Sequence, residues 1–295
     1  MDALQKIKYS FSGHESFYCK SIWLKKGFDF VLAGRNFNSP DSVLHLGVGK
    51  NMVSSIRFWL RAFGMLEENE LTEMASYIFD NENGKDPYLE DLRTTWLLHY
   101  LLIASDNASI YKLLFLEFQR EHSGEFSREQ LHLFLKRKTS ESDFPSVYNE
   151  NTIKRDIGVL LQNYCMPKQD RPNEDFSAVF IDLSLIKETE GDDYSSRQSN
   201  VKYYHFNIKG KMSVASDLFL YAILDSNEKE QIISFELLLD LALIFCMSKT
   251  ELVDVLTEIT RNYPNYLRYS DDAGIKQLFI LKEMDKKEVL EQYYS

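Results

Sequence analysis

Cysteine, glycine and proline are scarce in this chain of 295 residues. Its three cysteines, Cys19, Cys165 and Cys246, are far apart and odd in number. This excludes a disulfide framework and a cysteine-based zinc knuckle, and it is typical of a reducing cytoplasm. The 12 glycines and 6 prolines are too few for the many tight turns of an all-β sandwich. The composition therefore favours helices.

Long apolar runs are also missing. No stretch reaches the length that crosses a membrane, and the N-terminus lacks the apolar region of a secretory signal. With 44% hydrophobic residues, the chain can bury a sizeable core, and its length predicts two or three domains. We therefore expect a soluble cytoplasmic protein with no membrane partner.

The sequence also lacks an excess of basic residues, the usual mark of a protein that binds nucleic acid. There are 45 acidic against 34 basic residues, and the formal net charge is -11. The basic residues are nevertheless gathered in four segments: 20–26, 50–61, 128–138 and 154–155. This segregation allows one positive face on an acidic protein, with acidic surfaces left for protein partners.

An amphipathic helix is predicted after the glycines at positions 47 and 49. Its apolar residues recur at helical spacing: Met52, Val53, Ile56, Trp59, Leu60 and Phe63. Side chains that can donate to phosphates or base edges lie off that stripe: Lys50, Asn51, Ser54, Arg57 and Arg61. Gly64 ends the helix, and an extended segment follows. This order of elements predicts the second helix of a winged helix-turn-helix.

The same glycines look like the end of a nucleotide-binding phosphate loop. That motif needs a glycine four positions before its Gly-Lys pair and a serine or threonine directly after it. Leu44 and Asn51 occupy those positions. The tight turn and the Mg²⁺-binding hydroxyl are therefore missing, which argues against a phosphate loop.

Similar profiles recur along the rest of the chain. The sequence predicts a mainly α (α+β) fold of tandem winged helix-turn-helix-like units with short β-hairpin wings. We place these units at residues 1–107, 108–190 and 191–295. In the second unit, a helix over 149–161 exposes Lys154 and Arg155. The very apolar segment 88–103 predicts a buried central helix.

The third unit has helices predicted at 234–245 and 249–263, followed by two strands. Its second helix carries Glu251, Asp254 and Glu258, so it is acidic where the first unit is basic. We therefore expect this unit to contact a protein or to act as a scaffold rather than to read DNA.

Two interpretations of the polar segment 11–17 remain open. In the first, Ser12 caps the following helix and Glu15 completes a capping box. In the second, His14 and Glu15 perform acid/base chemistry or grip a phosphate.

Further side chains are assigned from their surroundings in the sequence. The helix over 20–32 is predicted with Ile22 inward and with Lys25 and Lys26 outward. His45 and His99 lie within apolar runs, so both are expected in the core.

Three motifs carry a resemblance to a known family. They are Phe11-Ser12-Gly13-His14-Glu15, Trp23-Leu24-Lys25-Lys26-Gly27 and Leu46-Gly47-Val48-Gly49-Lys50-Asn51-Met52-Val53. They resemble the signature of a bacterial family long catalogued as a domain of unknown function, which includes the SspB-type component of phage-defence systems. Its members sit beside cysteine desulfurases and ATP-pyrophosphatase-type sulfur transferases in DNA phosphorothioation gene clusters.

The resemblance implies work on double-stranded DNA together with those sulfur-transfer proteins, and DNA nicking as the activity. Nicking implies Mg²⁺ as a possible cofactor, although no Asp-x-Asp, His-x-x-x-His or His-Asn-His pattern identifies metal ligands. Where the family signature has threonine this chain has Ser16, and Lys20-Ser21-Ile22 replaces an Arg-Tyr-Gly-like run.

Two hypotheses follow. In the first, the chain is a DNA-binding component of a phosphorothioation system that nicks DNA to allow sulfur incorporation, with His14 and Glu15 as catalytic residues. The DNA contacts would be Ser12, Lys25, Lys26, Lys50, Asn51, Arg57, Arg61, Lys154 and Arg155. In the second, it is a non-catalytic scaffold or a transcription-regulator-like protein that binds a partner protein.

Overall fold

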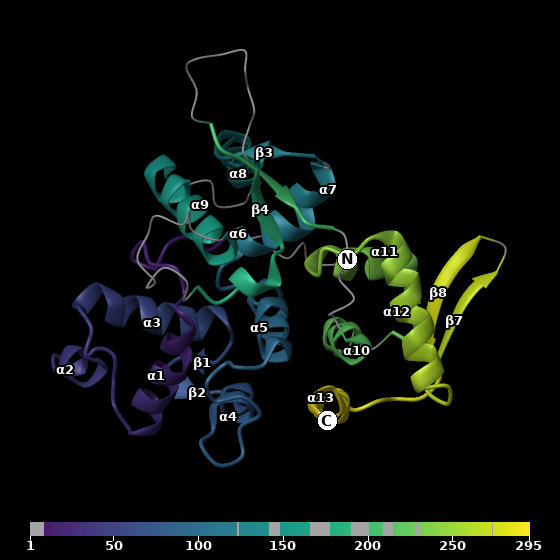
Figure 1. Ribbon diagram of the computed structural model, residues 1–295, viewed down its shortest axis with the longest axis horizontal. Coiled ribbons are helices and arrows are strands. Elements are labelled where there is room, and N and C mark those ends of the chain that lie inside the picture. The colour runs from purple at the N-terminus through teal and green to yellow at the C-terminus, as the bar shows by residue number, and fades with distance from the viewer. Residues whose placement is uncertain are drawn as a thin grey trace, which may run out of the picture. The chain divides into compact units, whose positions relative to one another are not determined.

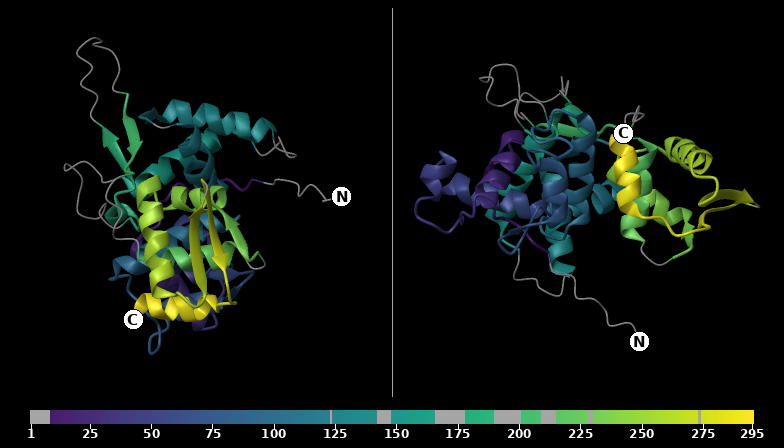
Figure 2. Two further views of the ribbon diagram at one scale, coloured as in Figure 1. Left: turned by 90° about the vertical axis from the view of Figure 1, so that its right-hand side faces the viewer. Right: turned by 90° about the horizontal axis from the view of Figure 1, so that it is seen from below.

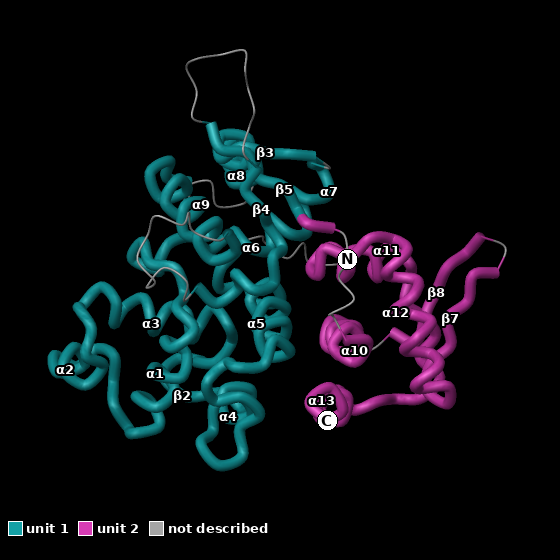
Figure 3. The backbone as a smooth tube through the Cα atoms, viewed as in Figure 1, with its two compact units in different colours: residues 1–206 teal, residues 207–295 magenta. Residues whose placement is uncertain are grey.

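The computed structural model describes residues 9–122, 124–141, 148–165, 178–189, 201–208, 215–227, 230–272 and 274–295. The chain forms two compact units, residues 1–206 and residues 207–295 (Figure 3). The predicted boundary at residue 107 lies within unit 1, and the one between residues 190 and 191 falls outside the described residues. The division into three domains therefore stays a prediction.

The first half of unit 1 consists of helices and one small hairpin (Figure 1). Its elements are α1 (Ser21–Leu32), α2 (Ser42–Leu46), α3 (Lys50–Ala62), β1 (Leu66–Glu67), β2 (Glu70–Leu71), α4 (Glu73–Phe79) and α5 (Leu92–Ala104). Gly47 and Gly64, which follow α2 and α3, have left-handed φ values of 62° and 68°. A residue with a Cβ adopts such angles at a cost, so glycine ends both helices here.

Close packing of α1 against α3 fixes the position of the amphipathic helix. A Cβ added at Gly27 of α1 would lie 2.7 Å from Leu60 Cδ1 and 2.8 Å from Ile56 Cγ2. Only a glycine therefore allows this approach. The predicted inward stripe of α3 is buried at Val53, Ile56, Trp59 and Leu60, as its helical spacing requires.

Two expectations for α1 are wrong. Ile22 is 62% exposed, and Lys25 is 6% exposed. Gly27 lies on the face that α1 turns to α3, while Leu24 and Phe28 are buried, so the inward side is rotated from the face that hydrophobicity alone selects.

The second half of unit 1 contains longer helices and a three-stranded sheet. Its elements are α6 (Ser109–Lys112), the π-helix η1 (Leu113–Phe118), α7 (Gln119–Glu121), β3 (Phe126–Ser127), α8 (Arg128–Glu141), α9 (Glu150–Tyr164), the 3-10 helix η4 (Ile181–Leu183), β4 (Ile186–Thr189) and β5 (Tyr203–Phe206). The strands pair antiparallel in the order β3-β5-β4.

The two halves of unit 1 share a core. Helix α5 is buried on all sides except near its ends, which confirms the prediction of a central helix. The backbone N–H of Cys19 donates to Asn163 Oδ1 of α9 at 2.9 Å, and Lys20 forms a β-bridge with Ala178. The segment before α1 is therefore attached to the second half of the unit.

Unit 2 has the same kind of architecture. Its elements are α10 (Ser216–Ser226), β6 (Ile232–Ser234), α11 (Phe235–Ile244), α12 (Lys249–Asn262), β7 (Leu267–Asp272), β8 (Ile275–Ile280) and α13 (Lys286–Tyr294). The antiparallel order is β6-β8-β7, with Leu267 opposite Ile280. Figure 2 shows the β7–β8 hairpin in yellow, projecting from the helices of this unit.

Two parts of the chain thus follow one order of elements: helix, strand, helix, helix, strand, strand, with the last strand in the middle of its sheet. The first half of unit 1 instead has three helices, a two-stranded hairpin and then two further helices. The mainly α fold with small antiparallel sheets is confirmed. The identity of these parts as winged helix-turn-helix units stays a prediction. Within the described ranges, no helix combines the length and apolarity needed to cross a bilayer.

Candidate nucleic-acid interface

The exposed side of α3 is basic. Lys50 and Asn51 are exposed in its first turn, and Arg57 and Arg61 are partly exposed one turn apart. The 13-residue helix contains no aspartate or glutamate. Its side chains therefore present donors and positive charge, as the sequence predicts.

The N-terminus of α3 has no side-chain cap. Its N-cap residue is Gly49, with extended backbone (φ -64°, ψ 159°), and no side chain accepts from the first-turn N–H groups among the described residues. These N–H groups and the helix dipole favour an anion at this end.

Neutral groups hold the two arginines of α3. Arg57 donates to Asn38 Oδ1 and to Asn69 Oδ1, each at 2.9 Å, and Arg61 donates to the Glu68 backbone oxygen at 2.6 Å. In the part of the chain that the structure describes, the acceptors of both guanidinium groups are amide and backbone oxygens and no carboxylate. Partial burial and the nearby charge of Arg61 lower the pKa of Arg57 from its usual value.

This arrangement leaves positive charge without compensation. Arg57 Nε is buried and has no hydrogen-bond partner among the described residues. Two guanidinium groups that are held in place but not neutralised suit a phosphate, because arginine binds phosphate oxygens through paired N–H donors. Exposed Glu67, Glu68 and Glu70 on the neighbouring hairpin limit this positive surface on one side.

The two lysines of α1 differ from expectation. Lys25 Nζ pairs with Asp29 and donates to Asn81 Oδ1 at 2.7 Å, so its charge is already neutralised. Lys26 Nζ donates to the Leu46 backbone oxygen at 3.0 Å, which joins α1 to the end of α2.

The other residues predicted to contact DNA lie on α9 and in the segment before α1. Lys154 pairs with Glu150 one turn earlier on α9, and Arg155 is exposed. Ser12 is exposed, and its backbone N–H donates to Asp156 Oδ2 at 2.8 Å. A role of these residues in DNA binding stays a prediction.

His14 forms a buried pair with Asp156 of α9. Its Nε2 lies 2.8 Å from Asp156 Oδ1, and the two side chains are 6% and 2% exposed. Because His14 Nδ1 accepts from the Ser16 N–H at 3.1 Å, the ring proton belongs on Nε2, which donates to the carboxylate. The imidazole also stacks near Trp59 of α3, with ring centroids 6.4 Å apart. His14 thus connects α9 to α3.

The loop that carries His14 has unusual backbone angles. Ser12, Gly13, Glu15 and Ser16 all have positive φ. A Cβ on Gly13 would lie 2.6 Å from Phe58 Cδ2, so glycine is needed for both its φ of 102° and its close contact.

The proposed capping box is therefore wrong. Helix α1 starts at Ser21, its N-cap is Lys20, and no side chain caps it. The polar segment instead binds Asp156 through the Ser12 N–H and His14 Nε2. Catalytic roles for His14 and the exposed Glu15 stay predictions.

Sequence reasoning missed Asp156. A signal in the sequence existed, because Asp156 lies three residues after Ile153 and next to Ile157, on the inward face of α9, where an acid needs a partner.

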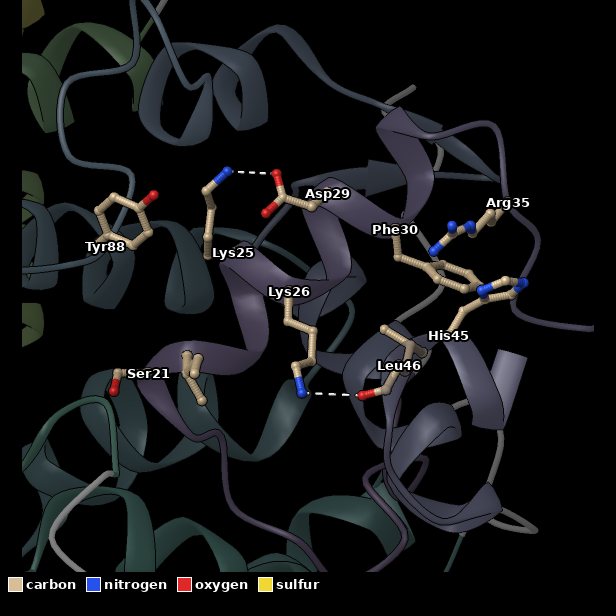
Figure 4. A pocket seen from close by; sticks show the side chains of 10 residues that line it. Ser21, Lys25, Lys26, Asp29, Phe30, Arg35, His45, Leu46 and Tyr88 are labelled. Carbon is tan, nitrogen blue, oxygen red and sulfur yellow. Dashed lines mark hydrogen bonds and ion pairs between the residues drawn. The ribbon is translucent and has the colours of Figure 1, made fainter. Parts of the chain in front are cut away.

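The sequence also gave no indication of a pocket between α1, α2 and the loop at Tyr88 (Figure 4). His45, expected in the core, is exposed and lines this pocket, whereas His99 is fully buried as expected.

Magnesium ligands are not evident. Among the residues with described positions, no three or more His, Cys, Asp or Glu side chains gather in a way that could hold a metal ion. We therefore assign no residue to Mg²⁺.

Comparisons with known proteins agree with the resemblance inferred from the sequence. The model of a family described as proteins of unknown function, DUF4007, matches residues 11–294. Two similar solved structures are crystal structures of SspB, one with a bound magnesium ion. Their TM-scores are 0.81 and, for the magnesium-bound one, 0.80; each is 25% identical and aligned over 98% of this chain and 89% of its own. No functionally curated protein matches the sequence.

Proposed function

Because the chain belongs to the DUF4007 family, we propose that it is a DNA-binding component of a bacterial DNA phosphorothioation and phage-defence system. In this proposal the exposed side of α3 lies against double-stranded DNA. The likeness to SspB over nearly the whole chain supports the system, and the charge of α3 supports the contact with DNA.

A single observation carries the contact with DNA. Arg57 and Arg61 are positioned by amide and carbonyl oxygens rather than by carboxylates. An arginine that already pairs with a carboxylate must give up that partner to bind a phosphate, whereas these two keep their charge available. Lys50 and the uncapped N-terminus of α3 extend the same positive surface.

Duplex binding with a salt titration tests this contact. Replacing Lys50 and Arg57 together by alanine should weaken binding and reduce the slope of log K against log [salt] by about 1.8, roughly 0.9 for each lost phosphate contact. The matched control is Arg261→Ala, which removes an exposed arginine from unit 2. Unchanged affinity and slope in the double variant would remove α3 from the interface.

The proposal includes DNA nicking, the activity that the family resemblance implies, without assigning residues to it. Relaxation of a supercoiled plasmid, with Mg²⁺ or with EDTA, measures this activity. Glu15→Gln is the informative variant because Glu15 is exposed, whereas His14 is buried in a pair with Asp156. Activity that survives in Glu15→Gln clears Glu15, and no relaxation by the wild type under either condition contradicts nicking.

A scaffold function is the second candidate, and the acidic α12 favours it. Asp254 and Glu258 are exposed on this helix. A cysteine desulfurase or an ATP-pyrophosphatase-type sulfur transferase in the cytoplasm is the partner that we propose for this surface. Replacing both acids by lysine should weaken co-purification with such a partner and leave DNA affinity no lower. Unchanged co-purification would exclude α12 as the contact.

A further inference from the structure

A pocket of ligand size lies between α1, α2 and the loop at Tyr88. Its volume is about 540 Å³, within the range of small-molecule sites. Ile22, Phe30 and Leu46 contribute apolar walls, and Lys26 and Arg35 contribute positive charge (Figure 4). Such a combination of apolar walls and a few polar groups is typical of a binding site.

The pocket has an excess of positive charge. Lys25 is neutralised by Asp29, the acid that lines the pocket. Lys26 donates only to a backbone oxygen, and the Arg35 side chain, which is exposed, has no partner among the residues placed by the structure. Two cations are therefore left to balance an anionic group.

An exposed aromatic ring stands at the opposite end from Arg35. Tyr88 is 69% exposed, and in the view of Figure 4 it lies at one end of the pocket, with Arg35 and His45 at the other and Lys26 between. Exposed aromatic rings near cations are the platforms on which nucleobases stack, while the cations meet the phosphate.

We propose that this pocket binds one nucleotide unit, with the base against Tyr88 and the phosphate on Lys26 and Arg35. The nucleotide can be free in solution, or it can be turned out of a DNA strand, as in enzymes that flip a base into a pocket. Only the second source rests on the proposed function, because binding of a free nucleotide needs no contact between α3 and DNA.

Titration calorimetry on the full chain tests the site, with dAMP, deoxyadenosine and inorganic phosphate as probes. We expect saturable 1:1 binding of dAMP, and binding about tenfold weaker for each of the two fragments, because each lacks one half of the contacts. Absence of saturable dAMP binding overturns the proposal.

Two variants separate the two halves of the site. Arg35→Ala should weaken binding of both dAMP and phosphate by about tenfold, the order expected for a charged hydrogen bond. Tyr88→Ala should weaken dAMP but leave phosphate unchanged, and Tyr88→Phe should keep dAMP binding. The matched control Lys249→Ala removes an exposed lysine from unit 2 and should change nothing. Binding of dAMP that is equal in wild type, Arg35→Ala and Tyr88→Ala also overturns the proposal.

Competition identifies the source of the nucleotide. Displacement of dAMP by a duplex with one bulged nucleotide, but not by a fully paired duplex, indicates a nucleotide turned out of DNA. If neither duplex displaces dAMP, the ligand is a free nucleotide. If both duplexes displace dAMP equally, the proposal of a site for a single nucleotide unit is overturned. The Lys50→Ala/Arg57→Ala variant should still bind dAMP, so failure of the DNA contact on α3 is recognised separately.

Discussion

Helices α3 and α12 each follow another helix after a short turn, yet their charged residues differ. Helix α3 carries basic residues and no acid, whereas α12 carries three acids, Glu251, Asp254 and Glu258, and two basic residues, Lys249 and Arg261. The N-terminus of α3 begins at an uncapped Gly49 and presents Lys50, whereas that of α12 is closed by a reciprocal capping box between Ser248 and Glu251. In α12 the Glu251 N–H donates to Ser248 Oγ and the Ser248 N–H donates to the Glu251 carboxylate, whereas no side chain of the N-cap residue caps α3. The two helices therefore present different N-termini, and the residues at the helix start influence which ligand each admits.

The two helices also differ in how they are held. Helix α12 buries Leu252, Leu256 and Ile259, an apolar stripe of ordinary kind. Helix α3 buries Trp59, which contacts the imidazole of the His14–Asp156 pair. Helix α3 thus has an interior polar pair among its contacts, in addition to its apolar stripe.

The largest effect is expected from breaking that pair. Asp156→Ala leaves the His14 Nε2–H and the Ser12 N–H without their acceptor, so the free energy of unfolding should fall by about 3–5 kcal/mol. Urea unfolding measures this loss. The exposed Asp182→Ala is the control and should stay within about 0.5 kcal/mol of the wild type. An equally small change in Asp156→Ala would show that α3 is held by apolar packing alone.

Reversing the charge of α3 is the next largest change. Arg57→Glu combined with Arg61→Glu places two carboxylates where we propose phosphates lie, so duplex affinity should fall by about 100-fold at low salt. Fluorescence anisotropy with a labelled duplex measures it. The matched change Arg261→Glu on α12 should alter affinity by less than about threefold. Equal losses of affinity in both variants would show that duplex binding depends only on the net charge of the protein and not on which helix carries the arginines.

Removal of the cap tests the closed end of α12. Ser248→Ala should destabilise the start of this helix by about 1 kcal/mol, because it removes the acceptor for the Glu251 N–H. Hydrogen exchange of the first-turn amides of α12 should become faster, and duplex affinity should not change. A loss of duplex affinity in this variant would implicate α12 in DNA binding.

Closing the open end of α3 should have the smallest effect and the opposite sign. Gly49→Asp adds a capping carboxylate where the backbone is extended and a Cβ meets no atom within 4 Å. The start of α3 should gain a few tenths of a kcal/mol, while duplex affinity falls about threefold because the carboxylate competes with phosphate. Hydrogen exchange and anisotropy measure the two effects. Higher affinity in this variant would show that phosphate does not approach the N-terminus of α3.

Much of the fold could be predicted from local pattern. The start and end of α3, its buried stripe, the central α5 and the hairpin of β7 and β8 all follow from helical or alternating spacing between glycines and other turn residues. The family resemblance could also be read from three short motifs, and the match over residues 11–294 confirms it.

The orientation of α1 could not be predicted in this way. Ile22 is exposed and Lys25 is buried, because the glycine at position 27 brings α1 close to α3 and so decides which side faces inward. Hydrophobicity selects the most apolar face of an isolated helix, but packing against a neighbour selects the face that fits.

The sequence by itself determined the helices, their order and the gathering of basic side chains on α3, since these depend on residues that are near one another in the chain. Only the tertiary structure decided which distant side chains meet the basic residues and the motif at residues 11–15. Asp156 is 142 residues from His14, and Asn81 and Asn38, which accept from Lys25 and Arg57, come from other segments. Such pairs form when the chain folds back on itself, and no local pattern encodes them.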